Sequence, residues 1–158
     1  RPKGIGIPQR AISRLVLGTD YAHFGPEEVW LQLAPISFDA STFEIWGALL
    51  HGAKLVVYPA GPLSLEELGR ALGQHGITSL WATTALFEQL QQRQPEALAK
   101  VKQVLAGGEV MTVARARERL AAGGTFVHAY GPTENTTFST CYRMDGPVEL
   151  GASVPIGG

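Results

Sequence analysis

Residues 125–134 read Thr125-Phe126-Val127-His128-Ala129-Tyr130-Gly131-Pro132-Thr133-Glu134. The first part of this stretch favours a β-strand. Gly131-Pro132 ends the strand, because proline has no N–H for a sheet ladder and glycine adopts backbone angles that other residues avoid. In an open α/β sheet, ligands bind at the carboxyl ends of the strands. The stretch therefore predicts a strand that leads into a ligand-binding loop.

Three side chains at this strand end have the chemistry to bind a nucleotide. Tyr130 has a ring that stacks on a flat base, and Thr133 has a hydroxyl that hydrogen-bonds a phosphate oxygen. Glu134 offers the carboxylate oxygens that magnesium prefers. A plain turn with a solvated glutamate has the same spacing, so the residues alone leave both interpretations open.

Asp39 is the second feature of interest. It precedes a helix predicted from about Thr42 to His51, in which Ser41 and Glu44 have the spacing of a capping box. In one interpretation the Asp39 carboxylate interacts with the positive end of this helix. In the other it binds the ammonium group of a ligand, because a carboxylate beside an apolar helix needs a cationic partner and no lysine or arginine is near in sequence.

Apolar runs of strand length alternate with helical patterns along the chain. Such alternation implies right-handed crossovers and a mostly parallel sheet with helices on both faces, a doubly wound, flavodoxin-like α/β fold. The expected strands are residues 29–34, 54–58, 77–81, 101–106, 125–130 and 136–142. The expected helices are residues 9–17, 42–51, 65–73, 85–92 and 112–121.

Composition limits the kind of protein. The chain has 158 residues, of which 45% are hydrophobic and 17% charged, as in one compact globular unit. Its net charge of −1 and scattered basic residues argue against nucleic acid and membrane surfaces as partners. The single cysteine, Cys141, excludes an internal disulfide and fits a cytoplasmic location. The chain begins at Arg1 rather than at methionine, so we expect it to be part of a larger protein.

The stretches 38–46 (Phe-Asp-Ala-Ser-Thr-Phe-Glu-Ile-Trp) and 130–134 together resemble adenylation domains of nonribosomal peptide synthetases, which are acyl-adenylate-forming enzymes. Residues 1–4 look like the tail of that family's phosphate loop, residues 32–35 resemble its core-strand signature, and residues 107–109 resemble its adenine-side loop. The resemblance implies that residues 1–158 are one subdomain, which contains the substrate pocket. Most of the phosphate loop would lie upstream, and the ribose-binding and lysine-bearing parts downstream. One departure is Gln9, which stands where these domains often carry histidine.

The resemblance also implies roles in binding ATP and magnesium. Tyr130 would stack on adenine, Thr133 would contact the α-phosphate, and Glu134 would bind magnesium. Thr133 and Glu134 are thus the implied catalytic residues. The remaining residues implied to border the nucleotide are Gly107, Gly108, Glu109 and Gly131.

By the same resemblance, Asp39 receives the α-ammonium group of an amino acid. The positions that match the family's pocket lining are Asp39, Ala40, Phe43, Trp81, Leu105, Gly107, Ala129, Thr137 and Phe138. None of these except Asp39 is charged, so the selected side chain should be apolar. The set resembles those of valine-activating domains, with leucine and isoleucine as close alternatives.

The implied reaction is attack of an amino-acid carboxylate on the α-phosphorus of ATP, giving aminoacyl-AMP and pyrophosphate, before transfer to a carrier-protein thiol. The isolated chain is expected to fold without catalysing it, since parts of the implied enzyme are absent. Its implied partners are the remaining adenylation subdomains and a carrier-protein domain. Two alternatives are a fragment of an acyl- or aryl-CoA ligase, which Asp39 disfavours because those acids lack an ammonium group, and a flavodoxin-like binding module without chemistry.

Overall fold

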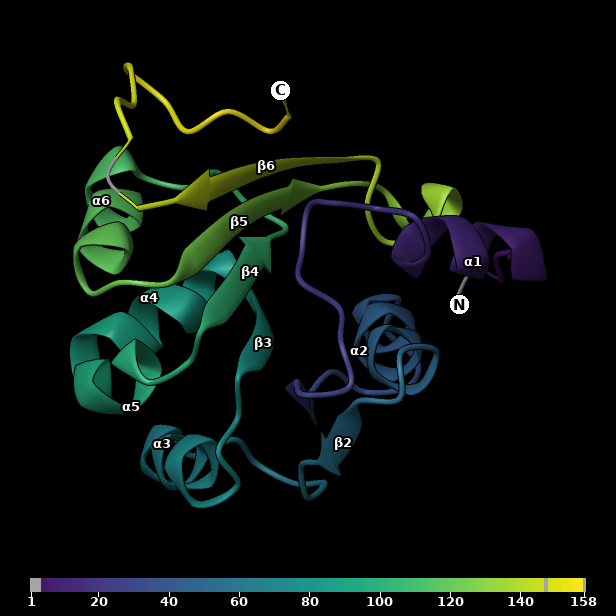
Figure 1. Cartoon of the computed structure of the whole chain (residues 1–158), viewed down its shortest axis with the longest axis horizontal. Coiled ribbons are helices and arrows are strands. Elements are labelled where there is room, and N and C mark those ends of the chain that lie inside the picture. The colour runs from purple at the N-terminus through teal and green to yellow at the C-terminus, as the bar shows by residue number, and fades with distance from the viewer. Residues whose placement is uncertain (1–3, 147, 158) are drawn as a thin grey trace.

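The computed structural model describes residues 4–146 and 148–157, so the expected phosphate-loop tail lies outside the described residues except for Gly4. Helices and strands alternate as the sequence predicts (Figure 1). The elements in chain order are α1 (Gln9–Val16), β1 (Val29–Gln32), α2 (Ala40–Leu49), β2 (Lys54–Val57), α3 (Leu65–Gln74), β3 (Ser79–Thr83), α4 (Thr84–Arg93), α5 (Pro95–Ala99), β4 (Gln103–Gly107), α6 (Val113–Ala121), β5 (Thr125–Tyr130), the 3-10 helix η1 (Thr133–Asn135) and β6 (Thr140–Asp145).

The strands form one six-stranded sheet in the order β2-β1-β3-β4-β5-β6. The first five strands are parallel, and β6 pairs antiparallel with β5. Without β6 this is the flavodoxin-like strand order. The predicted fold class is therefore confirmed, and the antiparallel partner at one edge is a detail that alternation alone does not predict.

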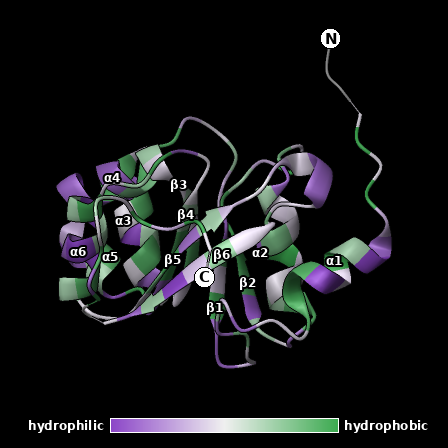
Figure 2. Cartoon of the chain, turned by 90° about the horizontal axis from the view of Figure 1, so that it is seen from above, coloured by the Kyte–Doolittle hydropathy of each residue, from purple (hydrophilic) through white to green (hydrophobic). Residues whose placement is uncertain are grey.

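Helices cover both faces of the sheet. Seen from above, α1 and α2 lie on one side, and α3, α4, α5 and α6 lie on the other (Figure 2). Each layer has its own apolar core: Trp30 and Phe43 belong to the first, and Phe87 and Phe126 to the second. The chain moves outward from β1 to β2 and then returns to β3 on the other side of β1. The carboxyl ends of β1 and β3 thus mark the point where strand order reverses, a preferred position for ligands.

Two local predictions are wrong. Ser41 and Glu44 do not form a capping box, because the Ser41 hydroxyl donates to the carbonyl of Phe38 at 2.8 Å and the Glu44 side chain faces the end of β1. The last strand begins at Thr140 rather than at residue 136. Its predicted start fails because Thr136 and Thr137 have φ angles of 58° and 64°, which are left-handed and incompatible with a strand.

Helix α3 has a side-chain cap at its N-terminus. The Ser64 hydroxyl accepts a hydrogen bond from the backbone N–H of Glu67 and so begins the helix. The short helix α5 was not predicted, and it begins with Pro95 at its first position. None of the helices within residues 4–146 and 148–157 has the length and apolar character needed to span a bilayer.

Candidate functional site

The carboxyl ends of β3, β4 and β5 form one wall of the predicted amino-acid pocket. Trp81 pairs with Leu105 across β3 and β4, and Gly107 pairs with Ala129 across β4 and β5. A Cβ at Gly107 would overlap the carbonyl oxygen of Ala129, so only glycine fits where the two strands end. Register therefore places four predicted pocket residues side by side.

The start of α2 and the loop before β6 bring the other pocket residues to this wall. The rings of Phe43 and Phe138 lie 5.0 Å apart between centroids. The Thr137 hydroxyl donates to the backbone carbonyl of Asp39 at 2.9 Å. All the predicted pocket residues except Asp39 are buried. The structure thus brings together residues from five segments of the chain.

Asp39 is half-buried and is the N-cap residue of α2. Its side chain makes no capping hydrogen bond. Among residues 4–146 and 148–157, no lysine, arginine or histidine forms an ion pair with it. The carboxylate lies at the positive end of the helix, and no cation of the described residues neutralises it. This arrangement suits a carboxylate that binds a cationic ligand group.

Glu44 is a positioning residue that sequence reasoning missed. Its side chain is fully buried, and its carboxylate accepts hydrogen bonds from the backbone N–H groups of Leu33 at 3.2 Å and Ala34 at 3.0 Å. Burial raises the pKa of Glu44 to about 8. Since β1 ends at Gln32, these two N–H groups have no sheet partner, and Glu44 fixes the loop that leads to Asp39. A charged residue within an apolar helical pattern was the available signal.

The predicted nucleotide residues form a separate, more exposed part of the site. Tyr130 is 53% exposed at the end of β5, and Gly108 and Glu109 are exposed just after β4. Gly108 has a φ angle of 93° and open space around its Cα, so a ligand can approach the backbone there. In η1, Thr133 is half-buried and Glu134 is exposed. Exposed and buried predicted residues thus meet along the same end of the sheet.

Comparison with known proteins identifies the family. A family model described as AMP-binding enzyme matches residues 1–157. The chain belongs to the AMP-binding enzyme family. A linear gramicidin synthase protein of Brevibacillus parabrevis is 48% identical over 157 residues, which are 99% of this chain and 2% of that protein. Tyrocidine synthase 3 of the same organism is 39% identical over 161 residues, which cover 99% of this chain and 2% of that protein.

Solved structures agree with this assignment. PA1221, a nonribosomal peptide synthetase protein containing adenylation and PCP domains, is 38% identical, with a TM-score of 0.88 over 99% of this chain and 32% of that chain. The N-terminal subdomain of Klebsiella oxytoca NpsA in complex with anthranilyl-AMSN is 32% identical. Its TM-score is 0.85, over 94% of this chain and 39% of that chain. These matches confirm the predicted resemblance to adenylation domains of nonribosomal peptide synthetases. The chain spans only a small part of these relatives' own length.

In this member of the AMP-binding enzyme family, a cavity of about 750 Å³ lies beside the predicted pocket. It occupies the carboxyl ends of β2, β1 and β3, where strand order reverses. Its lining is mostly apolar, and Trp81 is the residue that it shares with the predicted pocket. Sequence reasoning did not predict this cavity, because its walls come from strand ends and loops whose proximity depends on strand order.

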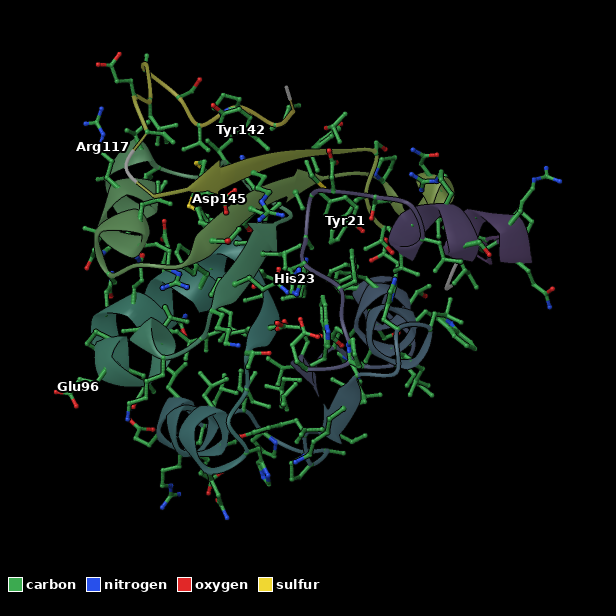
Figure 3. The ribbon with its side chains drawn as sticks, viewed as in Figure 1. Tyr21, His23, Glu96, Arg117, Tyr142 and Asp145 are labelled. Carbon is green, nitrogen blue, oxygen red and sulfur yellow. The ribbon has the colours of Figure 1, made fainter. Side chains whose placement is uncertain are left out.

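A polar cluster lies at the opposite, amino-terminal end of the sheet, just before β1. The backbone N–H of His23, a residue labelled in Figure 3, donates to the side chain of Gln103 at the start of β4, and the His23 Nε2 atom lies 2.5 Å from a Glu27 carboxylate oxygen. The neighbouring Glu28 is buried and accepts hydrogen bonds from Thr78 and Ser79. His23, Glu27 and Glu28 have metal-ligating atoms within 4.8 Å of one another. Each carboxylate already has a protein partner at one of its oxygens, Glu27 with His23 and Glu28 with Thr78 and Ser79, so internal hydrogen bonding accounts for the cluster.

Gly131 is required by close packing rather than by ligand contact alone. A Cβ there would lie 2.6 Å from the backbone nitrogen of Ser139 and 2.8 Å from the Cα of Phe138. We expect Gly131→Ala to destabilise the fold by about 1–3 kcal/mol through overpacking. Thermal unfolding measures the loss, with Gly6→Ala as the control because open space surrounds that glycine. Equal melting temperatures for the two variants would contradict the expectation.

Proposed function

We propose that this chain is the substrate-binding subdomain of an enzyme that activates an amino acid with ATP for nonribosomal peptide synthesis. The observation that carries the proposal is the Asp39 carboxylate, which has no ion-pair partner in the described part of the chain and borders a wall of buried apolar residues. An amino acid with an apolar side chain matches both features, because its ammonium group pairs with the carboxylate and its side chain enters the apolar region. Family membership supports the same function.

The residues of the strand-end loop beside the pocket have the chemistry to hold ATP and magnesium. The exposed Tyr130 ring is available for stacking on adenine, and the Thr133 hydroxyl for a hydrogen bond to a phosphate. Glu134 has an exposed carboxylate of the kind that binds magnesium. Magnesium, when bound, neutralises phosphate charge. The protein's contribution is to hold the carboxylate of the amino acid against the α-phosphorus, so catalysis depends on positioning and on charge neutralisation.

The proposal includes partners and a location. The remaining subdomains of the adenylation domain would complete the ATP site, and a carrier-protein domain in the same parent protein would receive the activated amino acid. Two solved structures that resemble this chain contain both adenylation and PCP domains, which supports this arrangement. The parent protein would act in the cytoplasm, where ATP is available.

The selected amino acid should be aliphatic, with valine as the proposed substrate. Phe43, Trp81 and Phe138 are bulky enough to shorten the pocket against an aromatic side chain, while the small side chain of Ala129 leaves room for branching. We expect valine, leucine and isoleucine to be used better than phenylalanine and aspartate by the full-length parent protein. Discrimination among the three aliphatic amino acids should be small, because one methylene in an apolar pocket is worth about 1–3 kcal/mol.

Amino-acid-dependent exchange of pyrophosphate into ATP measures the specificity constant of the parent protein for each amino acid. Aryl acids and fatty acids belong in the same panel, since they test the alternative of an acyl- or aryl-CoA ligase. Preference for phenylalanine or aspartate would overturn the aliphatic assignment and leave amino-acid activation intact. Use of acids without an amino group, in preference to all amino acids, would overturn the proposed role of Asp39.

A further inference from the structure

Arg14 joins α1 to the loop that carries two predicted pocket residues. Its guanidinium donates to the backbone carbonyl of Asn135 at 2.8 Å, of Thr136 at 3.3 Å and of Phe138 at 3.1 Å. These carbonyls lie 121 to 124 residues further along the chain. Figure 1 shows α1 beside the turn that connects β5 to β6. A planar guanidinium has several donors in a fixed fork, which lysine cannot reproduce.

The loop that Arg14 holds has a backbone conformation that needs support. Thr136 and Thr137 are consecutive non-glycine residues with positive φ angles. Such residues cost conformational free energy and persist only when the surroundings fix them. The carbonyl of Thr136 also accepts the N–H of Phe138 at 2.9 Å. The loop is therefore held from within by this tight turn and by the hydrogen bond from the Asn135 side-chain amide to the Ser139 hydroxyl at 2.7 Å, and from outside by the Arg14 guanidinium.

This loop presents its side chains to the pocket. The Thr137 hydroxyl donates a hydrogen bond to the backbone carbonyl of Asp39, so the loop and the start of α2 are directly linked. Phe138 packs against Phe43 and, with 6.1 Å between ring centroids, against Tyr21 in the segment after α1. Figure 3 shows Tyr21 close to the end of α1 and to the same turn. A change in the loop would thus move two pocket side chains and the residue that carries the carboxylate.

We propose that Arg14, although it lies outside the pocket, is a positioning residue that sets the shape of the amino-acid site by fixing residues 135–138. Within the described part of the chain Arg14 forms no ion pair, so its charge is directed to the three carbonyls. Its side chain does not contact the substrate in this proposal. It acts through Thr137 and Phe138, and it determines how well the pocket distinguishes one side chain from another. The inference rests on the proposed amino-acid activation.

The test compares Arg14→Met, Arg14→Lys and Arg10→Met in the full-length parent protein. Arg10 lies on the same helix and is exposed, so its replacement removes the same charge without touching the loop. Two quantities are measured: backbone hydrogen exchange of a peptide covering residues 133–140, and kinetics with valine and phenylalanine. Misplacement of binding groups by about 1 Å lowers rates on the order of a hundredfold, so we expect Arg14→Met to lower kcat/KM for valine at least about tenfold.

The preference for valine over phenylalanine should fall in Arg14→Met, and exchange at residues 133–140 should become faster. Arg14→Lys should be intermediate in both, and Arg10→Met should match the unmodified protein. Unchanged exchange in Arg14→Met would overturn the proposal, as would faster exchange with an unchanged kcat/KM for valine and an unchanged preference. If Arg14→Met does not fold, Arg14→Lys decides by the same criteria. An unmodified protein without amino-acid-dependent activity would instead overturn the proposed function, and with it the role of Arg14 in the pocket.

Discussion

Replacing Asp39 with alanine should lower the specificity constant of the parent protein for its amino acid by about 30-fold or more. A desolvated charge pair typically loses about 2–5 kcal/mol when one partner is removed, and each 1.36 kcal/mol is about tenfold. The loss should be large here because the residues around Asp39 offer the ammonium group no other carboxylate in the pocket lining. Amino-acid-dependent pyrophosphate exchange measures the effect.

A second substitution at Asp39 separates the effect of its charge from that of its structure, and a substitution at Asp20 is the control. Asp39→Asn keeps the size and polarity of the side chain and removes its charge, so its loss should approach that of Asp39→Ala. Asp20→Ala removes an exposed carboxylate elsewhere and should leave the constant unchanged. An unaltered specificity constant in Asp39→Ala would assign the carboxylate to the positive end of α2 alone.

Stability of the protein should fall as pH rises from about 4.5 to about 8, and Glu44 should be responsible. Burial raises the pKa of Glu44 from 4.5 to about 8, so between these values the folded state holds a proton that the unfolded state has released. The stabilisation is fully present below pH 4.5 and is lost as pH rises through 8. The slope for one proton is at most about 1.4 kcal/mol per pH unit.

Glu44→Gln should remove this slope, because the amide does not titrate and its oxygen still accepts from the N–H groups of Leu33 and Ala34. Urea unfolding at several pH values measures how the free energy of unfolding depends on pH in each variant. The matched control is Glu96→Gln, since Figure 3 shows Glu96 pointing away from the protein. An equal slope in the original protein and in Glu44→Gln would show that other groups cause the pH dependence.

The fold class follows from sequence alone because strand and helix periodicities are local. Alternation of such segments permits few topologies once crossovers are right-handed, and the structure has the flavodoxin-like order that this predicts. The positions of Asp39 near the start of a helix and of Tyr130 at the end of a strand were also predictable, since neighbouring residues define these boundaries, while their binding roles stay predictions. The resemblance to adenylation domains rested on such short contiguous motifs, and comparison with known proteins confirms it.

Tertiary structure alone decided the roles of Glu44 and Arg14. Glu44 has the spacing of a capping residue, and only the packing of α2 against β1 turns its carboxylate toward Leu33 and Ala34. The left-handed angles of Thr136 contradict its preference for strands, and they depend partly on contacts from a residue more than a hundred positions away. The strand propensity of a residue contributes less free energy than such long-range hydrogen bonds and the burial of side chains, so tertiary contacts decide the backbone conformation here. The sequence therefore determines which residues reach this end of the sheet, while tertiary contacts determine how they are held there.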